Sequence, residues 1–107
     1  MIIYNVTINI AKTEEKRWLI WMRTKHIQEV LDTGKFISAK LIKVLVEDNP
    51  DTETYAIQYT TESRENLEDY YKNFAPKLRK EGQDLFGDKM LGFRTELQVL
   101  ESYSHSN

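Results

Sequence analysis

The sequence predicts a single α+β domain in which four antiparallel strands form one sheet and two helices cover one face of it. Two observations lead to this fold class. Stretches with an apolar residue at every second position alternate along the chain with stretches whose apolar residues recur every three to four positions. These stretches come in the order strand, helix, strand, strand, helix, strand, and right-handed crossovers then place both helices on the same side of the sheet.

Strands are expected at residues 2–10, 36–47, 54–61 and 89–100. From Ile2 to Ile10, β-branched and aromatic residues alternate with polar ones, as in a strand with one buried face. The second segment is apolar on both faces in its middle, so we expect a bulge there or a strand end that leaves the sheet. Segment 49–52, which contains Pro50, favours a turn that joins this strand to the next as a hairpin.

The last strand has two different faces. Its apolar residues are expected to face the helices, and they are Leu91, Phe93, Leu97 and Val99. With the first and third strands at the centre of the sheet and the second and fourth at its edges, the other face stays open. That open face would present polar side chains from three strands, namely Asn5, Thr7, Gln58, Arg94 and Glu96.

The first helix contains both tryptophans, Trp18 and Trp21, and ends at Thr33-Gly34, where glycine can adopt the left-handed conformation. His26 lies on its inward stripe. Trp21 lies off that stripe, so it either packs under a neighbouring helix or marks a second contact surface. The second helix starts after Ser63 and is expected to kink or break near Pro76, because proline in a helix interior costs about 3 kcal/mol.

Length and composition limit the class of protein. The 107 residues suit one domain, which we place at residues 1–101, with a polar, disordered tail at 102–107. Fifteen basic and seventeen acidic residues give a net charge of -2, which argues against nucleic-acid and membrane partners. There is no cysteine and no apolar stretch long enough to cross a bilayer. The N-terminus lacks the pattern of a secretory signal, so a cytoplasmic protein is expected.

This succession of elements is the split βαβ, ferredoxin-like arrangement βαββαβ. The chain also resembles an uncharacterised bacterial ferredoxin-like family, the domain-of-unknown-function family 4286, in motifs spread from residue 2 to about residue 100. These motifs include Ile2-Ile3-Tyr4-Asn5-Val6-Thr7, Trp21-Met22, His26-Ile27, Thr33-Gly34-Lys35-Phe36, Phe74-Ala75-Pro76 and Phe93-Arg94-Thr95. The resemblance implies a looser kinship with dimeric α+β barrel proteins, which include monooxygenases, degradative enzymes and ligand-binding regulators. It implies no particular activity.

Few residues suit chemistry. His26 is a weak catalytic candidate, because a half-buried histidine more often only packs. No spacing indicates a metal site, and no motif indicates a cofactor. The open sheet face offers a ligand site in which Arg94 binds an anionic or carbonyl oxygen and Asn5 and Gln58 orient it. His26 would lie on the opposite side of the sheet, so one pocket could not use all four residues.

We therefore expect a homodimer that binds a small organic molecule at the sheet face. The apolar second strand at an exposed edge motivates the dimer, because such an edge favours association. Two alternatives remain: a structural or protein-interaction module with no active site, and a cofactorless monooxygenase-like enzyme of the dimeric α+β barrel type. A pocket of roughly 300 Å³ or more with converging polar groups would favour a binding site, and a filled interior would favour the module.

Overall fold

The computed structural model describes residues 1–45 and 49–106. In chain order its elements are β1 (Ile2–Ala11), α1 (Lys12–Trp21), the π-helix η1 (Met22–His26), α2 (Ile27–Asp32), β2 (Ser38–Lys43), β3 (Thr52–Thr61), α3 (Arg64–Asn73), α4 (Ala75–Phe86), the short 3-10 helix η2 (Gly87–Lys89) and β4 (Met90–Gln98). No helix within these residues is long and apolar enough to span a bilayer.

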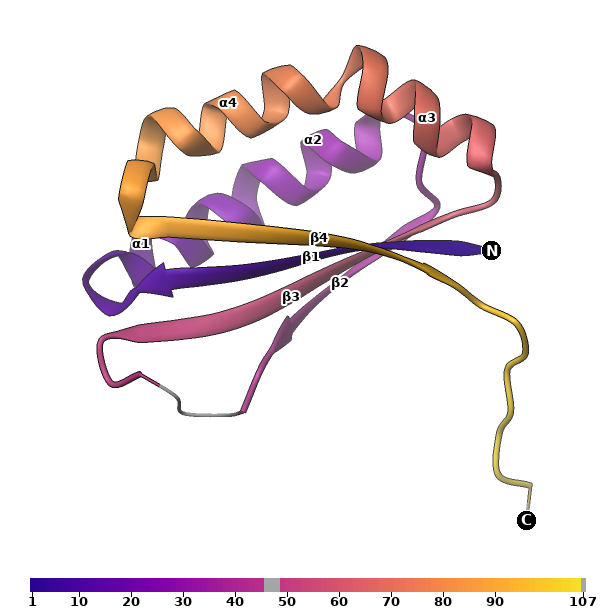
Figure 1. Cartoon of the computed structure of the whole chain (residues 1–107), viewed down its shortest axis with the longest axis horizontal. Coiled ribbons are helices and arrows are strands. Elements are labelled where there is room, and N and C mark those ends of the chain that lie inside the picture. The colour runs from indigo at the N-terminus through magenta and orange to yellow at the C-terminus, as the bar shows by residue number, and fades with distance from the viewer. Residues whose placement is uncertain (46–48, 107) are drawn as a thin grey trace.

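The four strands form one antiparallel sheet in the order β2-β3-β1-β4, and the helices lie together over one of its faces (Figure 1). The α+β class and the four-stranded antiparallel sheet are thereby confirmed. The core lies between sheet and helices because alternate residues of the two central strands point there. Among them Tyr4, Ile8 and Ile10 of β1 are buried, as are Tyr55 and Ile57 of β3.

The second strand is shorter than predicted. The range 36–47 was wrong at its start and in its length, because β2 runs only from Ser38 to Lys43. Phe36 lies before the strand and is buried in an aromatic cluster, where it stacks on Tyr4 and packs edge-on against Tyr70. Burial of this ring in the core therefore takes precedence over strand pairing. The end of the predicted range, residues 46–47, lies outside the described part of the chain.

The first helical segment is not one regular α-helix. Between α1 and α2 the π-helix η1 intervenes, and at its end the N–H of Ile27 donates to the carbonyl of Met22, five residues earlier. Thr24 Oγ1 also donates to the carbonyl of Ile20 at 2.7 Å, a side-chain bond that competes with the helical ladder. An i to i+5 arrangement aligns Trp21 with His26, and their rings stack with centroids 4.3 Å apart. The segment ends as predicted, with Gly34 at a φ of 77°.

The second helical segment consists of two helices, α3 and α4, which meet at Phe74, where φ is -126°. Pro76 stands in the first turn of α4, where its missing N–H leaves no helical bond unmade. Ser63 caps α3 by accepting a hydrogen bond of 3.1 Å from the backbone N–H of Asn66.

The last strand turns the opposite face to the helices from the one that was predicted. Residues directly opposite each other in an antiparallel pair share a face, and β4 places Arg94 opposite Val6 and Glu96 opposite Tyr4. Arg94 and Glu96 therefore face the helices, and the apolar row faces away, with Leu91, Phe93 and Leu97 exposed at 57%, 65% and 43%. The prediction failed because alternation tells which residues share a face but not which face is covered.

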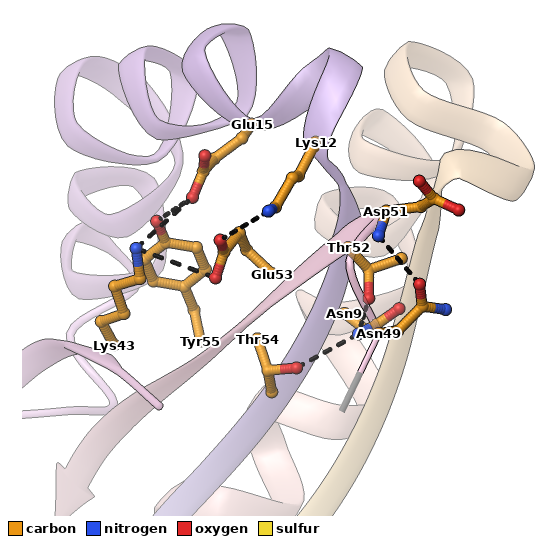
Figure 2. A network of polar contacts seen from close by, with 10 residues as sticks. All are labelled: Asn9, Lys12, Glu15, Lys43, Asn49, Asp51, Thr52, Glu53, Thr54 and Tyr55. Carbon is orange, nitrogen blue, oxygen red and sulfur yellow. Dashed lines mark hydrogen bonds and ion pairs between the residues drawn. The ribbon is translucent and has the colours of Figure 1, made fainter. Parts of the chain in front are cut away.

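Polar contacts fix the far end of the sheet, where the β2–β3 connection meets the start of α1 (Figure 2). Glu53 lies between Lys12 at 3.7 Å and Lys43 at 3.8 Å, and the hydroxyl of Tyr55 donates to Glu15 at 2.5 Å. The predicted turn is present, since Thr52 N–H donates to the carbonyl of Asn49. Beyond β4, the N–H of Val99 still donates to the carbonyl of Met1 at 3.0 Å, and residues 100–106 then run away from the domain (Figure 1).

Candidate functional site

Two adjoining hollows lie between the sheet and the helices. The inner one is a cavity of about 60 Å³ whose wall includes Tyr4, Trp18, Trp21, His26, Arg79 and Arg94. The outer one is a groove of about 540 Å³ along α4, η2 and β4. Both hollows are lined by Arg79 and Arg94, so these two side chains stand where one hollow adjoins the other. The inner cavity is smaller than a pocket for a typical ligand, whereas the groove is large enough.

The two arginines converge on one buried hydroxyl. Arg79 Nη2, from α4, donates to Tyr4 Oη at 2.9 Å, and Arg94 Nε, from β4, donates to the same oxygen at 3.0 Å. A phenolic oxygen has two lone pairs, so these two bonds occupy its accepting capacity and leave its own O–H free to donate. Three elements thus bring three hydrogen-bond donors to one place.

The two guanidinium groups of this cluster are not paired with a carboxylate among the described residues, although Asp88 lines the outer groove together with them. The nearest carboxylate along β4, that of Glu96, is instead bound by Arg64 at 2.7 Å and by the hydroxyl of Tyr71 at 2.6 Å. Two guanidinium groups that share a neutral acceptor form a site suited to an anion, because each can offer further N–H donors to carboxylate or phosphate oxygens.

His26 borders the same cavity from η1. Burial lowers the pKa of His26 from 6.5 to about 4; Glu81 acts against this, and the positive charges of Lys25 and Arg94 reinforce it. The imidazole is therefore neutral at pH 7. Its Nδ1 is buried and has no hydrogen-bond partner among the described residues. The ring is held in place by its stacking on Trp21.

The structure distributes the predicted site residues over the two faces of the sheet differently from the prediction. Arg94 and His26, which were placed on opposite sides of the sheet, lie on the same side and line one cavity. Asn5 and Gln58 are directly opposite each other on β1 and β3 and face away from the helices. Asn5 there donates to the hydroxyls of Thr7 and Thr95. The structure therefore separates Arg94 from the two amides that were expected beside it.

Arg79 and Tyr4 were not among the predicted site residues. Arg79 follows Leu78 and lies three residues before Gly82, beside the apolar stripe of α4, and a charged residue there is a signal that could have been noticed. Trp21 contacts Phe86 and lies close under α4, since a Cβ on Gly82 would come within 3.2 Å of its ring. Trp21 thus packs under a neighbouring helix, the first of its two interpretations. The described residues contain no group of metal-binding side chains.

The fold and the site define a small α+β protein with a cationic hollow under its helices. The chain belongs to the family described as "Domain of unknown function (DUF4286)", whose model matches residues 1–100. No curated protein matches it in sequence.

Solved structures share the fold at low identity. Two are dimeric ferredoxin-like proteins from uncultured marine organisms. The first has a TM-score of 0.73 and 8% identity over 95% of this chain and 97% of its own. The second has a TM-score of 0.68 and 15% identity over 98% and 100%. A Bacillus cereus protein assigned as an antibiotic biosynthesis monooxygenase has a TM-score of 0.63 and 13% identity over 97% of both chains.

Proposed function

We propose that the protein is a homodimer of ferredoxin-like βαββαβ subunits that binds a small anionic organic molecule between its sheet and its helices. In this description α1, η1 and α2 together count as the first helix, and α3 and α4 together count as the second. The observation that carries the proposal is the pair of guanidinium groups of Arg79 and Arg94 on the hydroxyl of Tyr4, without a carboxylate partner among the described residues.

The chemistry of the hollow fits an organic acid. Arginine can bind a carboxylate through two parallel N–H···O bonds. Apolar side chains, including Ile8 and Met90, line both hollows, and they suit the carbon skeleton of the ligand. A groove of about 540 Å³ lies within the size range of small-molecule sites. Arg94 thus keeps the role that the sequence predicted for it, with Arg79 and Tyr4 as partners in place of Asn5 and Gln58.

The open sheet face supports the homodimer. It exposes Leu91, Phe93 and Leu97 in a row along β4, and an uncovered apolar row of this kind favours association. Two similar folds are described as dimeric. A second copy packed sheet to sheet would cover this row. Asn5 and Gln58 would then lie in the interface, where they would need hydrogen-bond partners.

A monooxygenase-like enzyme is the second candidate. It is favoured by His26, a neutral base that borders the same cavity as the cationic pair, and by a fold shared with a protein assigned as a monooxygenase. Oxygen consumption with reduced aromatic acids, measured for the wild type and for His26→Phe, separates this candidate from simple binding. Oxygen uptake that depends on His26 would support the enzyme, and no uptake would count against it.

The binding proposal is tested with benzoate and its neutral isostere benzamide in calorimetric titrations. Benzoate is expected to bind and benzamide is not, because only the carboxylate interacts with the charge of both arginines. Arg94→Lys should lose about tenfold in benzoate affinity while it melts like the wild type, since lysine cannot form the bidentate pair. Arg64→Lys, on the surface of α3, is the matched control. Equal binding of benzoate and benzamide, or no binding of any carboxylate or phosphate, would contradict the proposal.

A further inference from the structure

The open face of the sheet lacks charged side chains over its three longest strands. The residues of β1, β3 and β4 that face away from the helices are Ile3, Asn5, Thr7, Asn9, Thr52, Thr54, Ala56, Gln58, Thr60, Leu91, Phe93, Thr95 and Leu97. Charged residues make up 30% of the chain, yet none belongs to this set. Such a surface suits burial against another protein surface, because charged residues are depleted at the centre of protein–protein interfaces.

Along β4 and just beyond its two ends, every second residue forms a row that is symmetric about Thr95. In chain order this row consists of Lys89, Leu91, Phe93, Thr95, Leu97, Val99 and Glu101. At equal distances from Thr95, the two nearest residues are apolar, the next two are apolar, and the outermost two carry opposite charges. No other centre has this property, because each of them sets a charged residue of the row against an apolar one.

This symmetry is the property that a contact between two identical surfaces requires. A two-fold axis places residue i of one copy opposite residue j of the other, and j opposite i. The row is therefore complementary to a second copy of itself that runs in the opposite direction. Apolar side chains then meet apolar ones, and the lysine at one end meets the glutamate at the other.

The residues level with Thr95 on the neighbouring strands can also pair with their own copies. Thr95 is directly opposite Asn5 on β1, and Asn5 is directly opposite Gln58 on β3. Hydroxyl and amide groups both donate and accept, so identical copies can satisfy each other across an axis. Asn5 Nδ2 donates to Thr95 Oγ1 at 3.3 Å, which leaves the Thr95 O–H and Asn5 Oδ1 for the partner. Lys40 continues this line on the outer strand β2, where its long side chain can extend into solvent.

We infer that two copies pack face to face about a two-fold axis that passes over Thr95, Asn5 and Gln58, perpendicular to the strands. β4 then lies antiparallel over β4 of the partner subunit. Phe93 faces the partner's Leu97, and the row ends with Lys89 beside the partner's Glu101. This inference rests on the proposed homodimer and adds its axis, its register and a role for the C-terminal tail.

The tail lies where this contact needs it. Beyond β4 it turns to the side of the sheet opposite the helices, where the second copy would lie (Figure 1). Leu100 and Tyr103 are exposed at 83% and 85%, so the tail adds little to the packing of its own subunit. Stacked sheets lie about 10 Å apart, a distance that about three residues of extended chain can span. Within the described residues neither Glu101 nor Lys89 forms an ion pair, so both charges are available to the partner.

Charge reversals at the two ends of the row test the inference. Lys89→Glu sets acidic residues against each other and Glu101→Lys sets basic ones against each other, twice in each dimer. Each variant alone should therefore dimerise about tenfold more weakly at low salt. An equimolar mixture of the two variants should form a heterodimer of wild-type affinity, because both contacts are restored in it. Lys77→Glu, on the exposed side of α4, is the control for net charge and should dimerise like the wild type.

A second readout locates the axis. The chain has no cysteine, so single cysteines can be introduced. Thr95→Cys should be joined to its own copy by a short bis-maleimide. Two copies of Leu91→Cys lie about 27 Å apart along the strands and should not be joined.

The outcomes separate the inference from the homodimer itself. If sedimentation shows a monomeric wild type, both are wrong. If the wild type is a dimer but the mixed charge variants associate no better than each variant alone, the homodimer stands and this arrangement is wrong. Cross-linking of Leu91→Cys but not of Thr95→Cys in a dimeric protein would overturn the arrangement in the same way.

Discussion

Arg94 on the edge strand β4 is joined to Tyr4 on the central strand β1 by a hydrogen bond of 3.0 Å from its Nε to the phenolic oxygen. This bond fixes the guanidinium through its Nε, so both terminal nitrogens remain available to a ligand. Arg79 binds the same oxygen from the helix side and so ties α4 to the sheet. Tyr4 therefore links the packing of the core to the geometry of the cationic site.

Tyr4→Phe should weaken both folding and binding. It removes the common acceptor of two charged donors, and we expect the free energy of unfolding to fall by about 1–2 kcal/mol. Benzoate affinity should fall severalfold because both arginines lose their fixed orientation. Urea denaturation and calorimetry measure the two effects. Tyr103→Phe, in the exposed tail, should change neither quantity, and an unchanged affinity in Tyr4→Phe would refute the positioning role.

Gly92→Val should reduce benzoate affinity without reducing stability. A Cβ at this position would come within 3.2 Å of Ile8 Cδ1 and within 3.7 Å and 3.8 Å of the two terminal nitrogens of Arg94, so a larger side chain fills the groove beside them. Valine also has a higher strand propensity than glycine, which offsets the crowding. Thr95→Val, on the other face of β4, is the control. Wild-type affinity in Gly92→Val would show that the ligand lies elsewhere.

Stability should depend on pH through His26. Its pKa is about 4 in the folded chain and 6.5 in the unfolded one, so between these values the unfolded state binds the proton more readily. The part of the free energy of unfolding that depends on a neutral His26 is fully present above pH 6.5. It is lost as pH falls towards 4, by about 3 kcal/mol in total. The difference in unfolding free energy between wild type and His26→Phe, measured by urea titration from pH 7 to pH 4, isolates it. A difference that stays constant over this range would contradict the prediction.

The charges around His26 also link binding to pH. Glu81 on α4 favours the imidazolium, and Lys25 and Arg94 oppose it. An anion at Arg94 neutralises one of these opposing charges, so benzoate should raise the pKa of His26 and bind more tightly as pH falls from 6 to 5. Calorimetry in buffers of different ionisation enthalpy measures the accompanying proton uptake. Zero uptake would show that His26 and the anion are not coupled.

Phe93→Asp should dissociate the dimer. Phe93 is the most exposed of the three apolar residues in the open-face row of β4, and a charge there would have to be buried in a sheet-to-sheet interface. Sedimentation equilibrium should give a dimer for the wild type and a monomer for the variant. Ile20→Asp changes an exposed apolar residue on α1 and should leave the dimer intact. A monomeric wild type, or a dimeric Phe93→Asp, would exclude this face as the interface.

Periodicity predicted much of the fold because local pattern and burial agree over most of the chain. The alternation from Ile2 to Ile10, the cap at Ser63 and the glycine stop at Gly34 each act through their own backbone and need no knowledge of distant residues. β2 was predicted too long because Phe36 belongs to a distant aromatic cluster, which local pattern does not reveal.

The site was harder to predict because it depends on register and on an irregular helix. Which face of β4 lies under the helices is fixed by its pairing with β1, and the apolar row at Phe93 pointed to the opposite choice. No local pattern of residues indicates the π-helix that stacks His26 on Trp21. Arg94 and His26 were each noticed as candidates, but only the structure brings them to one cavity.

A crystal structure with 4-bromobenzoate tests the proposed anion site most directly, because the bromine locates the ligand by its anomalous signal. We expect the bromine within the groove or the inner cavity, with a carboxylate oxygen about 2.7–2.9 Å from a terminal nitrogen of Arg94 or Arg79. A bromine bound elsewhere, with both guanidinium groups still on Tyr4 and no ligand density beside them, would contradict it.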